Sequence, residues 1–321
     1  KSRPTLMNEA VDTRVKVTLN HLKGLKGAAQ RLSFLPKQKA LSVLNGRHQS
    51  RLRGRGLNFE EMRAYRRGDD IRSIDWRATA RTGNAHVRVF SEERDRPALL
   101  VVDQCMPMFF GSVHNMKSVT AAEAASIAAH RILAAGDRVG GIVFNEESQA
   151  EFVPKRSENT IHALLNKITA YNNELHAAKP SNEPPDRFNR VLKSVSKLAH
   201  HDHLVIVFSD FAGADESTRR YLGAIAQHND LVLALVFDPV AEVIKPGPRT
   251  ILSDGERQAE INFSDRRVTD SLTELTRGRL NRILDWQSQI NLSVLPLSAA
   301  KDTALQIQDL LGDRGGSHQA H

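Results

Sequence analysis

Short runs of apolar residues alternate with amphipathic stretches through the last two-thirds of the chain. The apolar runs contain few polar positions, which is typical of strands buried on both faces of a parallel sheet. The stretches between them repeat apolar residues every three or four positions, as helices that cover such a sheet do. We expect strands at 99–102, 138–144, 204–208, 231–237 and 291–297, and helices at 117–135, 157–171, 186–199, 216–227, 265–289 and 303–311.

This alternation predicts an α/β fold with a doubly wound, mostly parallel sheet, which we place at residues 98–312. Two turn signals, Pro246-Gly247-Pro248 and Asp254-Gly255, interrupt the pattern and predict a hairpin inserted at about 239–263. The Gly-Gly-Ser-His sequence after the last expected helix predicts a disordered tail at 313–321.

The first third of the chain has other periodicities. Residues 10–33 repeat apolar residues at helical spacing, so one amphipathic helix is expected within an N-terminal region of helix and linker at 1–46. Its opposite face is basic, and such a helix lies either against its own domain or on a membrane surface. Residues 47–97 are divided by glycines and include an alternating stretch, Ala85–Phe90, so we expect a small β-rich module there.

Charge is distributed as unevenly as the hydrophobic pattern. The 321 residues include 45 Lys and Arg against 37 Asp and Glu, which gives a net charge of +8. Residues 1–98 hold 22 basic and 10 acidic residues, a net charge of +12, and the other 23 basic and 27 acidic residues give −4. Between Arg47 and Arg96 stand thirteen arginines and no lysine. Arginine is the side chain suited to paired bonds with carboxylates and phosphates.

Two interpretations of this Arg-rich module are open, and they do not exclude each other. In the first, the arginines are neutralised by the acidic residues of the same stretch. In the second, they form a docking surface for an acidic protein, a nucleic acid or an anionic membrane surface. The arginines expected to bind such a partner are Arg51, Arg53, Arg55, Arg66, Arg67 and Arg72.

Composition narrows the class of protein. Apolar residues make up 40% and charged residues 26% of the chain, which excludes wholesale disorder, collagen and a disulfide scaffold. Cys105 is the single cysteine, so no disulfide forms within the chain and a reducing compartment is expected. No apolar run is long enough to span a bilayer, and the first residues do not have the pattern of a signal peptide. We therefore expect a cytoplasmic protein, and because the sequence begins at Lys1 we expect residues before it.

The predicted sheet has one edge that draws attention. In doubly wound sheets, sites form at the carboxyl ends of the strands, where the strand order reverses. Two of the expected strands end in an aspartate, Asp103 and Asp210. This edge is where we expect a site.

A distinctive stretch of the Arg-rich module resembles a known signature. It runs from Gly54-Arg55-Gly56-Leu57-Asn58-Phe59 to Arg66-Arg67-Gly68-Asp69-Asp70-Ile71-Arg72-Ser73-Ile74-Asp75-Trp76, and Ala80-Arg81-Thr82-Gly83 follows. The pattern is similar to that of a bacterial family, the domain-of-unknown-function family fifty-eight. The resemblance implies a von Willebrand factor type A-like domain after the signature. It also implies a MoxR-type AAA+ ATPase as partner in the assembly or remodelling of protein complexes.

The signature residues also have a physical interpretation of their own. Gly68 permits a positive φ in a tight turn, and aspartates beside it accept backbone N–H bonds or pair with arginines. Trp76 is expected to anchor the module on the sheet. The residues to which we assign a structural role are Gly68, Asp69, Asp70, Asp75, Trp76 and Arg81.

The resemblance further implies a Mg²⁺ site, which type A domains build from D-x-S-x-S, a later threonine and a later aspartate. Asp103 and Asp210 match the two aspartates, but Cys105 and Pro107 replace the serines. The loop at 178–186, where the threonine is expected, has only Ser181. Mg²⁺ prefers hard oxygen ligands, and a thiol is soft. Either a degenerate site holds the ion, or both aspartates bond to loop backbone.

Other chemistry is sparse. Cys105 is either a reactive thiol or a buried one, and His200-His201-Asp202-His203 lacks the spacing of a zinc site. No phosphate-binding loop, nucleophile elbow or H-E-x-x-H sequence occurs. The sequence therefore favours a non-enzymatic protein-interaction adaptor. The alternatives are a binder of nucleic acid or anionic surfaces, through the Arg-rich module, and a metal-dependent hydrolase.

Overall fold

The chain forms two compact units in a computed structural model. The larger unit comprises Lys1–Asn45 with Arg96–His321, and the smaller unit is Gly46–Asp95. The smaller unit is thus an insertion in the larger one. The expected tail at 313–321 lies outside the described residues. The structure describes residues 12–31, 57–66, 69–92, 96–178, 184, 186–239, 250–253, 258–261, 266–290 and 292–311.

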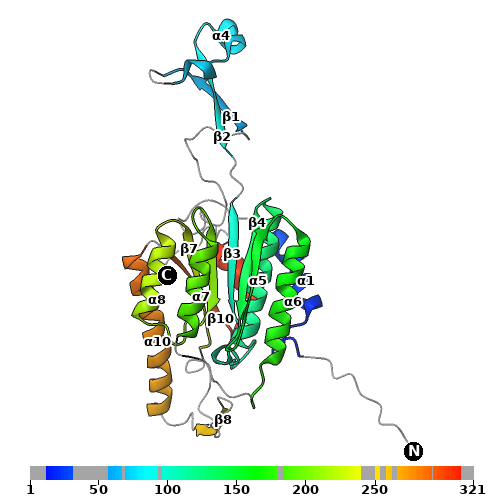
Figure 1. Ribbon diagram of the computed structural model, residues 1–321, viewed down its shortest axis with the longest axis vertical. Helices are drawn as coiled ribbons and strands as arrows, with labels where there is room; N and C mark the ends of the chain where they lie inside the picture. Colours follow the sequence, from blue (N-terminus) through cyan, green and yellow to red (C-terminus); the bar gives the residue numbers. More distant parts are fainter. Residues whose placement is uncertain are drawn as a thin grey trace, which may run out of the picture. The chain divides into compact units, whose positions relative to one another are not determined.

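The larger unit is built on a mostly parallel sheet, as predicted, but the sheet has six strands because β5 was not predicted from the sequence. The strand order is β10-β7-β6-β3-β4-β5, in which all neighbours are parallel except the antiparallel pair β4 and β5. The chain therefore winds outward from the centre twice, first to one edge and then to the other (Figure 1). The strands are β3 (Pro97–Asp103), β4 (Arg138–Phe144), β5 (Gln149–Lys155), β6 (Leu204–Ser209), β7 (Asp230–Phe237) and β10 (Leu292–Ser298).

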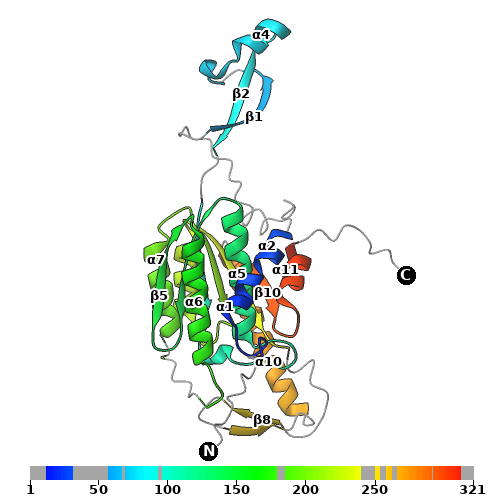
Figure 2. The ribbon, with the colours of Figure 1, turned by 90° about the vertical axis from the view of Figure 1, so that its right-hand side faces the viewer.

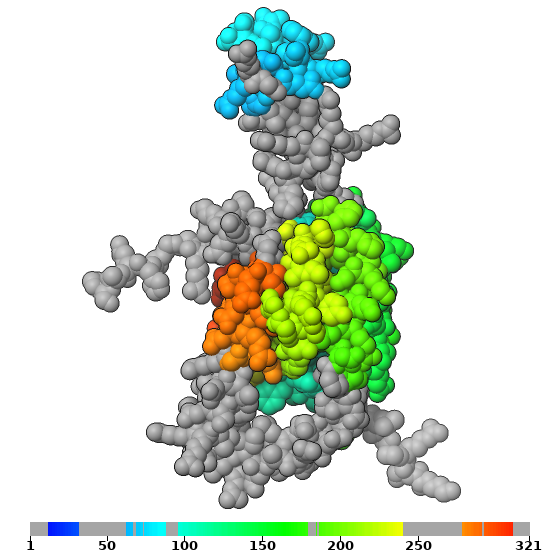
Figure 3. Space-filling model, turned by 60° about the vertical axis from the view of Figure 1, so that its left-hand side comes forward, coloured from blue at the N-terminus to red at the C-terminus, as the bar shows by residue number. Residues whose placement is uncertain are grey.

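Helices cover both faces of this sheet, because successive strand residues enter opposite cores. Leu100 and Val102 of β3 pack in one apolar cluster and Leu99 and Val101 in the other. The first face is covered by α5 (Lys117–Ala134), α6 (Glu158–Glu174) and α11 (Thr303–Leu311) (Figure 2). The second is covered by α7 (Arg187–Leu198), α8 (Glu216–Ala226) and α10 (Arg266–Gln289), and Figure 3 shows the coloured part of α10 beside α8.

Both edge strands carry a proline, which limits pairing with another chain. Pro154 lies in β5 and Pro296 in β10, and a proline cannot donate a bond to a further strand. Within the region of the expected hairpin, β8 (Thr250–Ser253) and β9 (Gln258–Ile261) pair antiparallel. This pair follows the carboxyl end of β7, at the lower end of the sheet in Figures 1 and 2. Among the described residues, no helix is both long and apolar enough to cross a bilayer.

The N-terminal segment differs from its prediction. Instead of one helix over 10–33, residues 12–31 form a turn and two short helices, α1 (Leu19–Gly24) and α2 (Lys26–Arg31). The side chain of Thr18 accepts from His21 N at 3.2 Å and starts α1 there, and a glycine ends that helix, where helix propensity is low. Leu22 and Ala29 are buried in the core beside α5. This basic amphipathic segment is therefore part of the larger unit.

A buried carboxylate ties this segment to the rest of the unit. Glu123 Oε1 of α5 bonds His21 Nε2 at 2.7 Å, and Glu123 Oε2 accepts from Asn115 Nδ2 at 2.9 Å and from Thr303 Oγ1 at 2.5 Å. The pairing with Glu123 raises the pKa of His21 against the opposing effect of burial. Segments from the beginning, middle and end of the chain thus meet at one side chain.

The smaller unit is a β-hairpin with two short helical segments between its strands. β1 (Leu57–Ala64) pairs antiparallel with β2 (His86–Glu92), and η1 (Ile71–Ser73) and α4 (Trp76–Thr82) lie between them in sequence. Asp75 caps α4 by accepting from the backbone N–H groups of Arg77 and Ala78 at 3.0 and 3.1 Å. Gly83 ends the helix at φ +76°, a conformation in which glycine carries no steric penalty.

Candidate functional site

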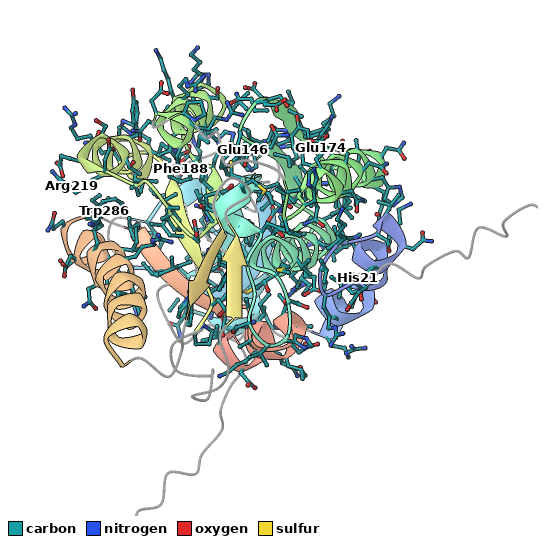
Figure 4. The ribbon with its side chains drawn as sticks, turned by 90° about the horizontal axis from the view of Figure 1, so that it is seen from below. His21, Glu146, Glu174, Phe188, Arg219 and Trp286 are labelled. Carbon is teal, nitrogen blue, oxygen red and sulfur yellow. The ribbon has the colours of Figure 1, made fainter. Side chains whose placement is uncertain are left out.

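Four buried acidic residues follow the ends of four neighbouring parallel strands. Asp103 ends β3 and Asp210 follows β6, at the point where the strand order reverses. Glu146 follows β4 and Asp238 follows β7. We call these four side chains, which are 3–6% exposed, the carboxyl edge. Figure 4 views the unit from below, the end at which this edge lies, with Glu146 labelled.

Asp103 is fully engaged with its neighbours. Its Oδ1 accepts from the backbone N–H of Cys105 at 2.9 Å, and its Oδ2 accepts from Ser209 Oγ at 2.6 Å. Burial, together with the negative charge of Asp210, raises the pKa of Asp103 to about 6, although both hydrogen bonds favour the ionised form. Asp103 thus joins the loops that follow β3 and β6.

Asp210 is paired with two cations. Lys117 Nζ donates to its Oδ2 at 2.5 Å and Arg279 Nη1 donates to the same oxygen at 3.0 Å. The Oδ1 atom accepts from the backbone N–H of Ala212 at 2.9 Å. Burial opposes ionisation, but the charges of Lys117 and Arg279 outweigh it and lower the pKa of Asp210. Asp210 is therefore a buried carboxylate that stays ionised.

Glu146 and Asp238 hold the loop between β3 and α5. The backbone N–H of Met106 donates to Glu146 Oε1. Asp238 accepts from the backbone N–H of Ser112 at 2.8 Å and from Ser112 Oγ at 2.6 Å. Together with Asp103, these carboxylates fix residues 104–116 at three points. Three of the four acidic residues of the edge therefore position this loop.

The loop after β6 adopts an uncommon backbone conformation at the same place. Phe211 has φ +54°, which is rare for a residue other than glycine. Its N–H donates to Ser209 Oγ at 3.0 Å, and its buried ring packs edge-on against Phe188 at 5.6 Å. Strained positions of this kind persist where the surrounding packing enforces them. Here packing fixes the turn that carries Asp210.

The residues present do not fit a bound Mg²⁺ ion. Cys105 is buried and its backbone contacts Asp103, and Pro107 has no side-chain oxygen. Ser181 lies outside the described residues. Lys117 takes the position beside Asp210 that a cation requires. In the part of the chain that the structure describes, no three His, Cys, Asp or Glu side chains are grouped so as to hold a metal ion.

Two further sequence candidates are not part of this edge. The Cys105 thiol is buried, as expected of a structural cysteine. In the histidine cluster, His201 Nδ1 bonds Asp202 Oδ2 at 2.9 Å, and both side chains are more than 70% exposed. The cluster lies in the connection between α7 and β6.

The Arg-rich unit uses its acidic residues locally. Arg63 makes a paired interaction with Asp69, with two N–O distances of 2.8 Å, and Asp69 also accepts from the backbone N–H of Arg66. Asp70 accepts from the backbone N–H of Arg72 at 2.9 Å. Internal pairing therefore occurs at Arg63. Arg51, Arg53, Arg55, Arg67 and Gly68 lie outside the described residues.

Several candidate side chains of this unit face solvent. Arg66, Arg72 and Arg81 are exposed. Trp76 is 67% exposed and Ile71 is 63% exposed, so neither contributes to a core of the smaller unit. An exposed tryptophan among arginines is a feature of binding surfaces.

From the sequence we did not predict two of the four acidic residues of the carboxyl edge, or the two cations that pair with Asp210. Glu146 and Asp238 follow expected strands just as Asp210 does, so the same rule could have identified them. Lys117 and Arg279 gave no such signal. Lys117 begins an alanine-rich helix, and Arg279 is one of several arginines in a helix some seventy residues after Asp210.

The fold and the edge define a class before any relative is considered. The larger unit is a doubly wound α/β protein whose switch-point carboxylates are bonded within the chain. Comparison with known families then shows to which family the chain belongs. The family described as "Protein of unknown function DUF58" matches residues 61–278, and the chain belongs to this family.

Similar proteins occur in mycobacteria. The "Uncharacterized protein Rv1480" of Mycobacterium tuberculosis (strain ATCC 25618 / H37Rv) is 27% identical over 240 residues, which cover 75% of this chain and 74% of that protein. The "Uncharacterized protein Mb1516" of Mycobacterium bovis matches to the same extent. No solved structure matches the chain.

Proposed function

We propose that this protein is a non-enzymatic adaptor with a von Willebrand factor type A-like domain, acting with a MoxR-type AAA+ ATPase on other protein complexes. The sheet order supports the type A-like assignment. The sheet is wound outward from β3 to both edges and is parallel except at β5, which is the doubly wound fold class that this resemblance implies. The switch-point edge, where such a sheet presents its loops, is then the surface for a partner.

The proposal rests on one observation, which is that the carboxylates of the carboxyl edge are all bonded to residues of the same chain. Each of the four accepts a hydrogen bond from a loop residue or pairs with a cation of the same chain. A general base has to reach a substrate proton, and a metal-dependent hydrolase needs free oxygen ligands. The edge instead presents a loop at fixed geometry, which suits recognition. We therefore do not propose the hydrolase.

Binding between the purified chain and a MoxR-type ATPase of the same genome tests the adaptor role. We expect association at micromolar concentration in calorimetry, with an affinity that depends on whether ATP, ADP or no nucleotide is present. Absence of association under all three conditions would contradict the proposal.

A matched pair of variants locates the surface. Val113 is 53% exposed in the loop fixed by the edge, and Val153 is 60% exposed in the edge strand β5. Val113→Glu places a charge on the proposed surface and is expected to weaken association at least about tenfold. Val153→Glu adds the same charge at similar exposure and is expected to leave association unchanged. Equal effects of the two would place the interface elsewhere.

The exposed aromatic and basic residues of the smaller unit favour a second candidate function, binding to nucleic acid or an anionic surface. Trp76, Arg72 and Arg77 are all exposed and supply an apolar ring and positive charge on the same small unit. Titration with duplex DNA and with anionic vesicles at increasing salt tests it. We expect Trp76→Ala to weaken binding even where salt has screened nonspecific attraction. If added salt weakens the binding of wild type and of Trp76→Ala equally, the binding is nonspecific charge attraction, and this candidate function is contradicted.

A further inference from the structure

We propose that Lys117, supported by Arg279, is a built-in cation that takes the place of a divalent metal ion at the switch point of the sheet. The carboxyl edge is then complete without metal, and its loops keep their conformation in the presence of chelators. This inference concerns the chain's own residues and stands independently of the adaptor role.

The contacts of Asp210 are those of a site filled by its own protein. Lys117 Nζ lies 2.5 Å from Asp210 Oδ2, with side-chain exposures of 10% and 4%. An ion pair so far removed from water is retained only where the two partners satisfy each other, because either charge alone would be strongly destabilising. In this pair the carboxylate of Asp210 is satisfied by Lys117 and is not available to a metal ion.

The position of Lys117 in its helix points the same way. It is the first residue of α5, an 18-residue helix with no acidic residue in its first turn. The helix dipole is positive at this end and disfavours a lysine there. The helix gains nothing from a cation at this position, whereas the loop after β6 gains a counter-ion. The lysine is therefore explained by its contact with Asp210.

The same geometry leaves no room for a metal ligand shell. Mg²⁺ binds carboxylate oxygens at roughly 2.0–2.1 Å and Ca²⁺ at roughly 2.3–2.6 Å. An ion at either distance from Asp210 Oδ2 would meet the ammonium group, which bonds to this same oxygen. Asp103, the other aspartate at this point, has one donor on each oxygen. A metal would have to displace Lys117 and break the bonds of Asp103.

Arg279 completes the arrangement from the other side of the sheet. Its Nη1 contacts both the carboxylate and, at 3.4 Å, the backbone carbonyl of Asp210, and its side chain is 40% exposed. Lys117 and Arg279 together supply two positive charges, whereas Asp210 carries one negative charge. The part of this cluster nearest to solvent is a guanidinium group.

Metal titration and thermal unfolding of the full chain test the proposal. For wild type we expect no Mn²⁺ binding by electron paramagnetic resonance at millimolar ion. We also expect the same Tm with Mg²⁺ and with EDTA. Lys117→Met removes the ammonium and leaves Asp210 buried with Arg279 alone, so Tm should fall by roughly 6 °C or more. The double variant Lys117→Met/Asp210→Asn removes both charges of the pair and should recover at least half of that loss.

Each result decides the question. Mn²⁺ binding to wild type with submillimolar Kd, abolished by Asp103→Asn or Asp210→Asn, would overturn the proposal. It would also be overturned if Lys117→Met were as stable as wild type, or if the double variant were no more stable than the single one. If Lys117→Met does not yield folded protein, recovery of folded protein by the double variant supports the proposal, and failure of both contradicts it.

Discussion

The carboxyl edge and the Arg-rich unit are built from the same kinds of side chain but use them differently. At the edge, the carboxylates are buried, and besides local backbone bonds they make bonds that join segments far apart in the sequence, such as Lys117 to Asp210. In the smaller unit, Asp69 and Asp75 bond to residues a few positions away, and the pair of Asp69 with Arg63 is only partly buried. Breaking a buried ion pair strongly destabilises the fold, whereas an exposed ion pair contributes little to the stability.

The largest expected effect separates these two ion pairs. Asp210→Ala leaves Lys117 buried and is expected to reduce the free energy of unfolding of the larger unit by about 3–5 kcal/mol. Asp69→Ala breaks the more exposed pair with Arg63 and should lower the stability of the smaller unit much less, because solvent screens this pair. Trp76 and Trp286 are the two tryptophans, one in each unit. Urea denaturation of a Trp76→Phe background, followed by fluorescence, therefore reports the larger unit.

Hydrogen exchange of the β1–β2 amides measures the smaller unit in the same samples. If Asp69→Ala cost as much as Asp210→Ala, the contrast between the two regions would be lost.

The next effect concerns pH. The pKa of Asp103 is about 6 in the folded protein and near its ordinary value of 3.8 in the unfolded chain. Between these values the folded protein holds the proton more tightly, so this group lowers the stability as pH rises from about 4 to about 6. The full change is about 3 kcal/mol. Asp103→Asn should remove this slope, measured as urea midpoints at a series of pH values. Wild-type and variant curves that run parallel would contradict the assignment.

A smaller effect sharpens the picture of the Arg-rich unit. Asp75 caps α4, and Asp75→Ala should cost about 1 kcal/mol, since two backbone N–H groups lose their acceptor. Asp75→Asn keeps an acceptor oxygen and is the matched control. Hydrogen exchange at Arg77 and Ala78 measures both. Equal protection in the two variants would mean that the cap does not stabilise this helix.

The smallest effect lies in the larger unit but away from its edge. The pKa of His21 is raised by Glu123, so the stabilisation from this pair is fully present below the ordinary value of 6.5 and is lost as pH rises through the higher folded value. We expect amide protection in α1, corrected for intrinsic exchange, to decline above that pH. His21→Gln should abolish the decline. A decline that persists in this variant would assign it to another group.

The sheet was predictable because its strands are continuous apolar runs. An unbroken apolar run such as Leu99–Val102 indicates a strand that is buried on both faces. The aspartate that follows the run then indicates where the carboxyl end of the strand lies. The single helix at 10–33 was wrong because periodicity does not register a cap, and Thr18 interrupts the pattern without changing its spacing.

The residues that satisfy Asp210 at the carboxyl edge could not be predicted from the sequence, for a different reason. The contacts of Asp210 come from residues 117 and 279, which only the winding of the sheet brings together. A sequence pattern identifies a carboxylate at a strand end, but it cannot tell whether a metal, a loop or a lysine will satisfy it.

The docking of residues 12–31 on α5 has a consequence for the topology of the whole molecule. Because the chain leaves the larger unit after α2 and returns to it at β3, the Arg-rich unit is tethered at both ends. A single protease cut in either connection would leave the fragments associated, held by the buried Leu22 and by the bonds of His21 and Glu123. A partner bound by the Arg-rich unit, as proposed above, would therefore stay linked to the α/β unit even after such a cut.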